Sequence, residues 1–368
     1  MYILFCIILI IAYSLCSGQY ENRKGYIKFC SLFLILLSAF RHPGVGKDTY
    51  GYIQGFLAAS SKSWQDVTAM FWDKYLNPDP TIGKDPMFYI FERAISTVCH
   101  NEYIYLLLIA IIVIVPLGIL VFKNTTNTRQ VLIFYLFYLN YFYTFIPNAA
   151  IRQSIACSFA LWAFIALQSS QKSKILKFIV LIVAGSFFHK SVLITLIVLP
   201  LLYIKSPKFI LYGSLLGFAI MLYAYQYVGM FLVADNNIYD MYSSSSYYDS
   251  TGTNRPVFVL LVFALAYFIQ ILGIGKDKNI ESNNLAYVGS SMTIVLLPLI
   301  WMDPSAVRII VFTGVWFALM LSKSIDMLPI SMKRLAYYAF ILILVGRFLV
   351  SPMDYWFCWQ SPDIILGN

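Results

Sequence analysis

YIYLLLIAIIVIVPLGILVF, residues 103–122, runs through 20 positions without a charged side chain. A hydrocarbon core about 30 Å thick needs roughly 20 apolar residues in a helix that crosses it. No water reaches the backbone at that depth, and a helix satisfies its N–H and C=O groups internally. The stretch therefore predicts a transmembrane helix and, with it, a helical membrane protein.

The rest of the chain repeats this pattern. Of its 368 residues, 60% are hydrophobic and only 12% are charged, which lies outside the usual soluble range. We expect one all-α domain, a polytopic helical bundle in a membrane, over residues 1–368 with about twelve transmembrane segments. The apolar runs lie near residues 1–17, 29–40, 103–122, 130–147, 150–168, 175–188, 191–204, 209–232, 256–274, 285–302, 306–322 and 335–350.

The charge distribution predicts how these segments are oriented. No basic residue precedes the first apolar run, so we interpret this run as an anchor with its N-terminus outside and not as a signal peptide. The loops assigned to the inner face then hold 15 of the 26 basic residues and four of the 17 acidic ones, which leaves 11 basic and 13 acidic residues outside. Loops rich in lysine and arginine stay on the inner side of a membrane. The formal charge of +9 therefore indicates how the segments are oriented and not a surface that binds nucleic acid.

RHPGVGKDTYGY, residues 41–52, follows the second apolar run. Its VGKDT resembles the end of a phosphate-binding P-loop, but Asp48 stands where serine or threonine is required, and Arg41 where the first glycine belongs. We therefore exclude a nucleotide site and interpret the glycines as marks of a tight loop. The two large outer loops are predicted at residues 41–102 and 234–255.

Charged residues from distant parts of the chain fall on the same outer face. A charge at the membrane centre costs about 2.5 to 3.5 kcal/mol on insertion scales, so arginines within helices are functional candidates. Singly, such residues also reach lipid headgroups, cap helices or pack locally. Together they indicate an electropositive pocket, because the arginine fork matches phosphate oxygens. The candidates are Arg41, Asp48, Arg152, His189, Arg255 and Arg308.

Aromatic side chains supply a second feature of the outer loops. Tyr52, Trp64 and Trp72 offer flat apolar faces on which sugars stack. The same residue types form the interfacial belt of many membrane proteins, so both interpretations stay open. The cysteines lack metal-ligand spacing, and a disulfide between Cys99 and Cys358 also stays open because both fall on the predicted outer face.

The first outer loop resembles a known family. The pattern R-x-x-x-x-G-x-D-x-x-x-Y, filled by Arg41, Gly46, Asp48 and Tyr52, is similar to that loop in EpsG-type polysaccharide polymerases, relatives of the O-antigen polymerase Wzy. Lys47 departs from the small polar residue that is commoner there.

Two later segments carry the same resemblance. IRQS at residues 151–154 and FHKS at residues 188–191 resemble the family's Arg-Gln helix and the Phe-His-x-Ser end of the helix that follows. SAVRIIVF at residues 305–312 resembles its C-terminal arginine-containing helix, with Phe312 where a tyrosine is expected. The resemblance covers roughly residues 1–350.

The resemblance implies a reaction and a location. Undecaprenyl-diphosphate-linked oligosaccharide repeats of O-antigen, capsule or exopolysaccharide are joined at the periplasmic face of a bacterial inner membrane. The growing glycan leaves its lipid diphosphate and joins the non-reducing end of the next repeat. Besides this substrate and membrane lipid, the implied partners are a flippase and a chain-length regulator, and no nucleic acid.

Each candidate residue has an expected role in that reaction. The site must neutralise the diphosphate, place the acceptor hydroxyl and remove one proton. Arginines perform the neutralisation that a metal performs elsewhere, so we expect neither metal nor cofactor. Arg152 and Arg308 are the expected diphosphate clamps, Arg41 and Arg255 further diphosphate ligands, and either Asp48 or His189 the base.

Two other functions stay open. A GT-C glycosyltransferase using a polyprenyl monophosphate sugar usually has an acidic pair in its first outer loop, where this chain has only Asn77-Pro-Asp79 and Lys84-Asp85. A flippase would move lipid-linked sugars without chemistry, and transporters tend to have two repeated halves with polar groups near the midplane. Neither feature is evident in this sequence.

Overall fold

The structure of the chain is a computed structural model. It describes residues 1–18, 21–46, 48–76, 85–143, 150–232, 255–274, 284–301, 307–350 and 353–360. In these residues it contains helices, one isolated antiparallel bridge between Arg41 and Phe357, and no strand, so the predicted all-α class is confirmed. The chain divides into two compact units, Met1–Leu196 with Ala339–Asn368, and Ile197–Tyr338.

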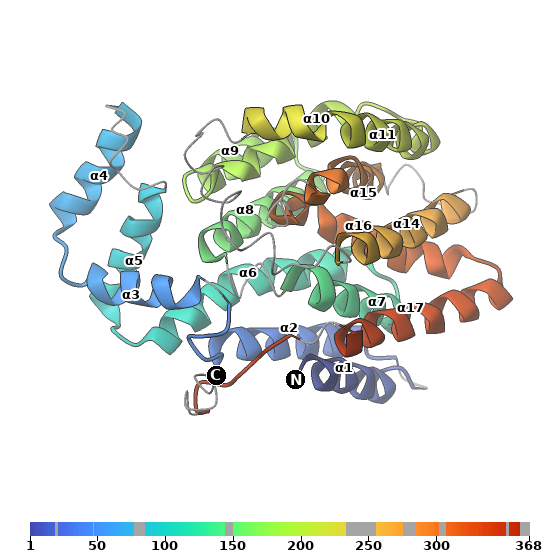
Figure 1. Cartoon of the computed structure of the whole chain (residues 1–368), viewed down its shortest axis with the longest axis horizontal. Coiled ribbons are helices and arrows are strands. Elements are labelled where there is room, and N and C mark those ends of the chain that lie inside the picture. The colour runs from blue at the N-terminus through green and yellow to red at the C-terminus, as the bar shows by residue number, and fades with distance from the viewer. Residues whose placement is uncertain are drawn as a thin grey trace. The chain divides into compact units, whose positions relative to one another are not determined.

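The long helices of the first unit lie side by side in a stack (Figure 1). From one edge to the other their order is α1 (Tyr2–Cys16), α2 (Arg23–Ala39), α6 (Glu102–Asn124), α8 (Ile151–Leu167) and α9 (Lys174–Ser186). Helix α7 (Thr128–Tyr138) packs on α1 and α2 and continues as a π-helical turn, η1 (Leu139–Tyr143).

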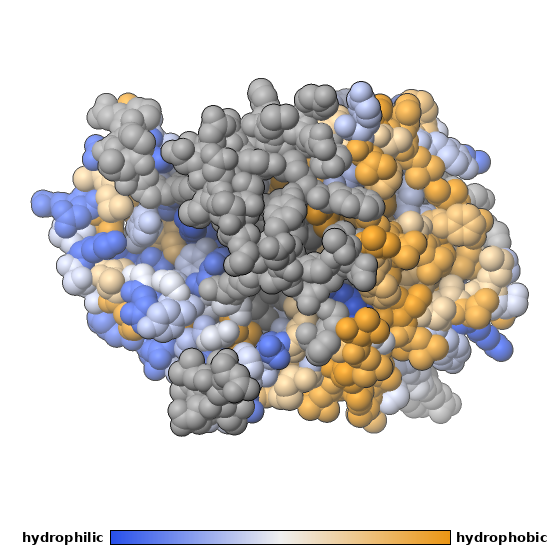
Figure 2. Space-filling view, in the orientation of Figure 1, coloured by the Kyte–Doolittle hydropathy of each residue, from blue (hydrophilic) through white to orange (hydrophobic). Residues whose placement is uncertain are grey.

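Three shorter helices lie together at one end of this stack, at the left of Figure 1: α3 (Thr49–Ala59), α4 (Trp64–Leu76) and α5 (Pro86–Val98). They occupy the segment predicted as the first outer loop. Short helices with polar faces lack the long apolar run by which the other helices were found. Figure 2 shows this end of the molecule mostly in hydrophilic colours. We call α3, α4 and α5 the polar helical layer.

The second unit is built around two buried helices. Helix α15 (Asn284–Leu296) packs between α11 (Pro207–Leu232) and α16 (Val307–Met327), and α14 (Arg255–Ile274) packs on α16. Nothing larger than glycine fits at Gly289, because a Cβ there would lie 2.5 Å from the ring of Trp316. The second unit also contains α10 (Val198–Leu201) and η3 (Leu297–Trp301), whereas η2 (Lys190–Ile197) and α17 (Ile330–Val350) each have residues in both units.

Each of the twelve predicted apolar runs coincides with helix in the structure. Among the described residues, three helices are long and apolar enough to cross a membrane: Glu102–Asn124, Pro207–Ala224 and Ile309–Met327. Five further apolar helices are shorter. The count of about twelve crossings therefore stays a prediction, as does the periplasmic side of the polar helical layer.

Helix α14 carries an exposed apolar surface that is suited to contact with lipid. Apolar side chains on one side of this helix are exposed: Val257, Phe258, Leu261, Leu265, Phe268 and Leu272. The side of α14 that faces the viewer in Figure 2 is correspondingly orange. An exposed apolar stripe of this length is unfavourable in water and favourable in a hydrocarbon core.

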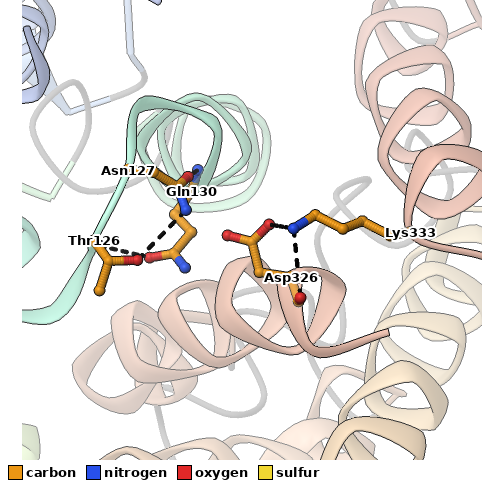
Figure 3. Close-up of polar contacts among 5 residues, drawn as sticks. All are labelled: Thr126, Asn127, Gln130, Asp326 and Lys333. Carbon is orange, nitrogen blue, oxygen red and sulfur yellow. Dashed lines mark hydrogen bonds and ion pairs between the residues drawn. The ribbon is translucent and has the colours of Figure 1, made fainter. Parts of the chain in front are cut away.

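Short polar signals fix where helices begin and turn. Asn101 accepts hydrogen bonds from the backbone of Tyr103 and Ile104, at 2.9 and 3.1 Å, and so caps α6. Asn127 accepts from the Gln130 N–H at 3.0 Å and caps α7 (Figure 3). In the second unit, Lys333 of α17 pairs with Asp326 near the end of α16, also drawn in Figure 3.

Candidate functional site

The polar helical layer meets the long helices of the first unit at Arg152, the second residue of α8. Its Nη1 donates to Asp85 Oδ2 at 3.0 Å, and its Nε donates to the Tyr52 hydroxyl at 3.3 Å. The guanidinium carbon also lies 5.8 Å from the centre of the Tyr52 ring. One side chain therefore ties together α3, α5 and α8.

The two partners of Arg152 are themselves held by their helices. Asp85 is the N-cap residue of α5, directly before Pro86 at the first helical position. Tyr52 lies one turn into α3, where its N–H donates to the Asp48 carbonyl at 3.1 Å, and its ring packs edge-on against Phe88 of α5 at 5.4 Å. The orientation of the guanidinium is thus set from two sides.

This arrangement leaves part of Arg152 available. Its side chain is 30% exposed, whereas that of Asp85 is 9% exposed. Nη1 and Nε have partners, and Nη2 has none among the residues that the structure describes. An oriented guanidinium with donors left over is suited to bind an oxygen of an anion such as phosphate.

A buried carboxylic acid lies beside this arginine. Glu92 of α5 is 2% exposed and accepts a hydrogen bond from the Tyr105 hydroxyl at 3.0 Å. Burial raises the pKa of Glu92 to about 7, against the lowering effects of the Tyr105 hydrogen bond, Lys62 and Arg152. Its carboxylate approaches the α3 backbone closely, since a Cβ on Gly55 would lie 3.5 Å from Oε2.

The sequence analysis assigned no role to Asp85 or Glu92. A signal for Glu92 exists: of the buried residues of α5, Phe88, Glu92 and Ser96 are each four positions apart, which is helical spacing. A glutamate on the buried face of an amphipathic helix marks a buried carboxyl group. Asp85 has no such signal, because its partner is 67 residues away in sequence.

Arg41, predicted to bind the diphosphate, is 1% exposed. Nη1 donates to the carbonyl and the hydroxyl of Ser38, and Nε and Nη2 have no partner among the described residues. Burial lowers the pKa of Arg41 to about 10, opposed by the neighbouring Tyr143, Tyr355, Tyr2 and Tyr105. In this structure Arg41 fills a tyrosine-rich core and does not present its guanidinium at the surface.

A C-terminal segment, residues 353–360, covers the end of α2 beside Arg41. The His42 N–H donates to the Trp356 carbonyl at 2.9 Å, and the Cys358 N–H donates to the Phe40 carbonyl at 2.8 Å. The Tyr355 hydroxyl also donates to the Leu37 carbonyl. We call residues 353–360 the C-terminal strap. The thiols of Cys99 and Cys358, left open as a disulfide pair, are both free.

The two candidate bases lie near the polar helical layer. Asp48 is the N-cap residue of α3. His189 follows α9, and its Nδ1 lies 2.6 Å from the Ser191 hydroxyl. The preceding Phe188 packs on Phe91 of α5, with 6.0 Å between ring centres. Both residues therefore belong to this end of the first unit, and which of them acts as a base stays a prediction.

The remaining candidates are placed in part. Trp64 and Trp72 lie on α4 and are 43% and 56% exposed, as a sugar-stacking surface requires. Arg255 and Arg308 belong to α14 and α16, but their side chains lie outside the described residues, as does the second predicted outer loop apart from the start of α14. The structure brings Arg152 and Tyr52 into contact, and the roles of all nine candidates stay predictions.

The fold and these residues define a class: an all-helical membrane protein with an oriented arginine where a polar helical layer meets the long helices. A family model described as the EpsG family matches residues 24–359. The chain belongs to the EpsG family, as the sequence resemblance indicated, and this membership associates it with membrane-bound polysaccharide synthesis. No curated protein and no solved structure matches the chain.

Proposed function

We propose that this protein polymerises undecaprenyl-diphosphate-linked oligosaccharide repeats at the periplasmic face of a bacterial inner membrane. The observation that carries the proposal is Arg152, which is oriented by Asp85 and Tyr52 and whose side chain is 30% exposed. Family membership supports the class of reaction. A flippase and a chain-length regulator are the proposed partners.

The chemistry of the step determines what the site must supply. A hydroxyl oxygen of the acceptor repeat forms a bond to the anomeric carbon of the growing glycan, and the bond from that carbon to the lipid diphosphate breaks. The diphosphate leaves with the electron pair, and the hydroxyl proton goes to a base. Donors aimed at the leaving oxygens stabilise the charge that develops there.

Arg152 and Arg308 are the proposed diphosphate clamps, and Arg255 is a further proposed diphosphate ligand. Arg41 supports the site from beneath by fixing the end of α2, since it is buried. Tyr52, Trp64 and Trp72 are proposed to contact sugar rings, and the side chains of the two tryptophans are exposed. Asp48 and His189 both remain candidates for the base.

The test is a polymerisation assay with purified protein in lipid vesicles and a lipid-linked repeat. The wild type is expected to give a ladder of longer glycans, and Arg152→Ala a single repeat at normal protein level. Arg129→Ala is the matched control, because Arg129 is also the second residue of a helix, α7, and is exposed. Transport of unchanged repeats by the wild type would instead indicate a flippase, and a full ladder from Arg152→Ala would refute the diphosphate assignment.

The choice of base is tested in the same assay. His189→Ala and Asp48→Asn are compared for turnover and for binding of a polyprenyl diphosphate. The base is the residue whose replacement removes turnover and leaves binding intact. Loss of binding in both variants would assign them to substrate placement.

The proposed orientation is tested with topology reporters. A reporter inserted after Lys174, at the start of α9, is expected to report the cytoplasm. One inserted within residues 243–246 is expected to report the periplasm. The reverse pattern would place the polar helical layer on the cytoplasmic side and contradict the proposed location.

A further inference from the structure

Asp85 binds the same guanidinium that the proposed function assigns to the lipid diphosphate. Its Oδ2 lies 3.0 Å from Arg152 Nη1, where the carboxylate oxygen occupies one donor that a phosphate oxygen would also seek. The Asp85 side chain is 9% exposed and is fixed at the N-terminus of α5, so it stays beside the arginine.

The other acidic group near Arg152 is a weaker source of negative charge. Glu92 is buried and its pKa is raised to about 7, so much of it is protonated near neutral pH. The effect of Asp85, in contrast, extends to α4, because burial first and the Asp85 charge second raise the pKa of Tyr75. Asp85, and not Glu92, is thus the carboxylate that directly contacts Arg152 and balances its charge.

We propose that Asp85 is a positioning residue that holds Arg152 in place in the empty site. It also lowers the affinity of Arg152 for the lipid diphosphate, so that this product leaves after each transfer. The proposal rests on the proposed function, in which Arg152 binds the diphosphate. A polymerase must exchange its lipid diphosphate product for a new lipid-linked repeat in every cycle. A site that binds this group too tightly lowers turnover even when the chemical step is fast.

The physical reason is a balance of charge. When the diphosphate contacts the guanidinium, the Asp85 carboxylate on Nη1 repels the incoming anion. In a partly solvated site, a charge within a few ångströms changes affinity by about tenfold. An asparagine at this position keeps the shape and the hydrogen-bond acceptor for Nη1 and loses the repulsion.

Tyr52 provides a matched control on the same arginine. Its hydroxyl accepts from Nε at 3.3 Å, so Tyr52→Phe removes one anchor without changing the formal charge. Loss of orientation alone weakens anion binding. Loss of the Asp85 charge strengthens it, so the two anchors predict effects of opposite sign.

The experiment measures the affinity of the purified full-length protein for farnesyl diphosphate, a short polyprenyl diphosphate, in detergent. We expect the Kd to fall about tenfold in Asp85→Asn, to stay within about twofold of the wild type in Asp85→Glu, and to rise about threefold in Tyr52→Phe. In the polymerisation assay, Asp85→Asn is expected to lower both kcat and KM. A purely structural role would lower the amount of folded protein or raise KM.

The outcomes separate this inference from the proposed function. An unchanged or higher Kd in Asp85→Asn overturns the role of Asp85, whatever the behaviour of Arg152. Wild-type affinity in Arg152→Ala overturns the proposed diphosphate site itself. If Asp85→Asn does not yield folded protein, Asp85→Ser is used, for which a lower Kd is again expected and an equal or higher one is contradictory.

Discussion

Two arginines of this protein, Arg41 and Arg152, have the same side chain and the same predicted role but opposite surroundings. Arg152 lies where α8 meets the polar helical layer, is 30% exposed, and is paired with a carboxylate. Arg41 lies at the end of α2, is 1% exposed, and is surrounded by tyrosines without a carboxylate in contact among the described residues. The surroundings of Arg152 suit it to bind an anion, whereas Arg41 is part of the core.

An arginine beside an apolar run therefore has one of two roles: it binds a ligand or it stabilises the core. A guanidinium that keeps donors at the surface lends them to a ligand. A buried guanidinium without a counter-ion is retained only if the structure around it depends on its contacts, since burial of a charge is expensive. Tyr105 interacts electrostatically with Arg41 and is hydrogen-bonded to Glu92, and Glu92 in turn interacts electrostatically with Arg152.

The largest expected effect belongs to Arg152. Replacement by alanine removes donors aimed at the leaving diphosphate, and loss of one such group typically lowers turnover by about 10² to 10³ fold. Initial rates of glycan extension check this, with protein level and melting temperature as controls. A loss smaller than about tenfold would place Arg152 with Arg41 as a structural residue.

Arg41→Ala should show the opposite pattern. Truncation leaves a cavity in a buried site and removes the bonds to Ser38, so we expect a loss of stability of about 2–4 kcal/mol. Thermal unfolding in detergent measures this change. Folded Arg41→Ala protein is expected to bind farnesyl diphosphate as the wild type does, and weaker binding with unchanged melting would assign Arg41 to the ligand site.

Glu92, which is buried and hydrogen-bonded to Tyr105, predicts a dependence of stability on pH. Its pKa in the folded protein is raised from 4.5 to about 7, so the folded state binds this proton more tightly than the unfolded state does. The contribution is fully present below pH 4.5 and is lost as the pH rises to about 7, with a magnitude on the order of 3 kcal/mol. Melting temperatures at pH 5 and pH 8 measure it.

Glu92→Gln is the matched variant for this effect, because it keeps the size and an acceptor for Tyr105 but does not ionise. We expect it to melt at a higher temperature than the wild type at pH 8 and to reduce the difference between pH 5 and pH 8. An equal slope in both proteins would show that other groups cause the dependence.

The smallest expected effect concerns the C-terminal strap that covers Arg41. Tyr355→Phe removes the hydroxyl that donates to the Leu37 carbonyl and keeps the ring, so a loss of about 1 kcal/mol is expected. Thermal unfolding again measures it, with Tyr338→Phe as control, since Tyr338 is exposed on α17. Activity at low temperature should not change, and a large loss of activity would link the strap to the site around Arg152.

The regions around the two arginines also differ in how much of their structure could be predicted from the sequence. The apolar runs predicted the long helices of both units, because apolar length is a local property of the chain. The helices of the polar helical layer were not predicted, since they are short and lack the long apolar run by which the other helices were found. Glu92 could have been found from its spacing with Phe88 and Ser96, whereas the pairing of Asp85 with Arg152 depends on two distant segments.

By itself, the sequence determined that this is an all-α membrane protein of the EpsG family, because the length of an apolar run and the residues of a short motif are local properties of the chain. It also determined which arginines to consider. Only the tertiary structure decided that Arg152 is held by Asp85 and Tyr52 and that Arg41 is enclosed by tyrosines and the C-terminal strap. The physical reason is that exposure and charge pairing arise from contacts between segments far apart in the chain.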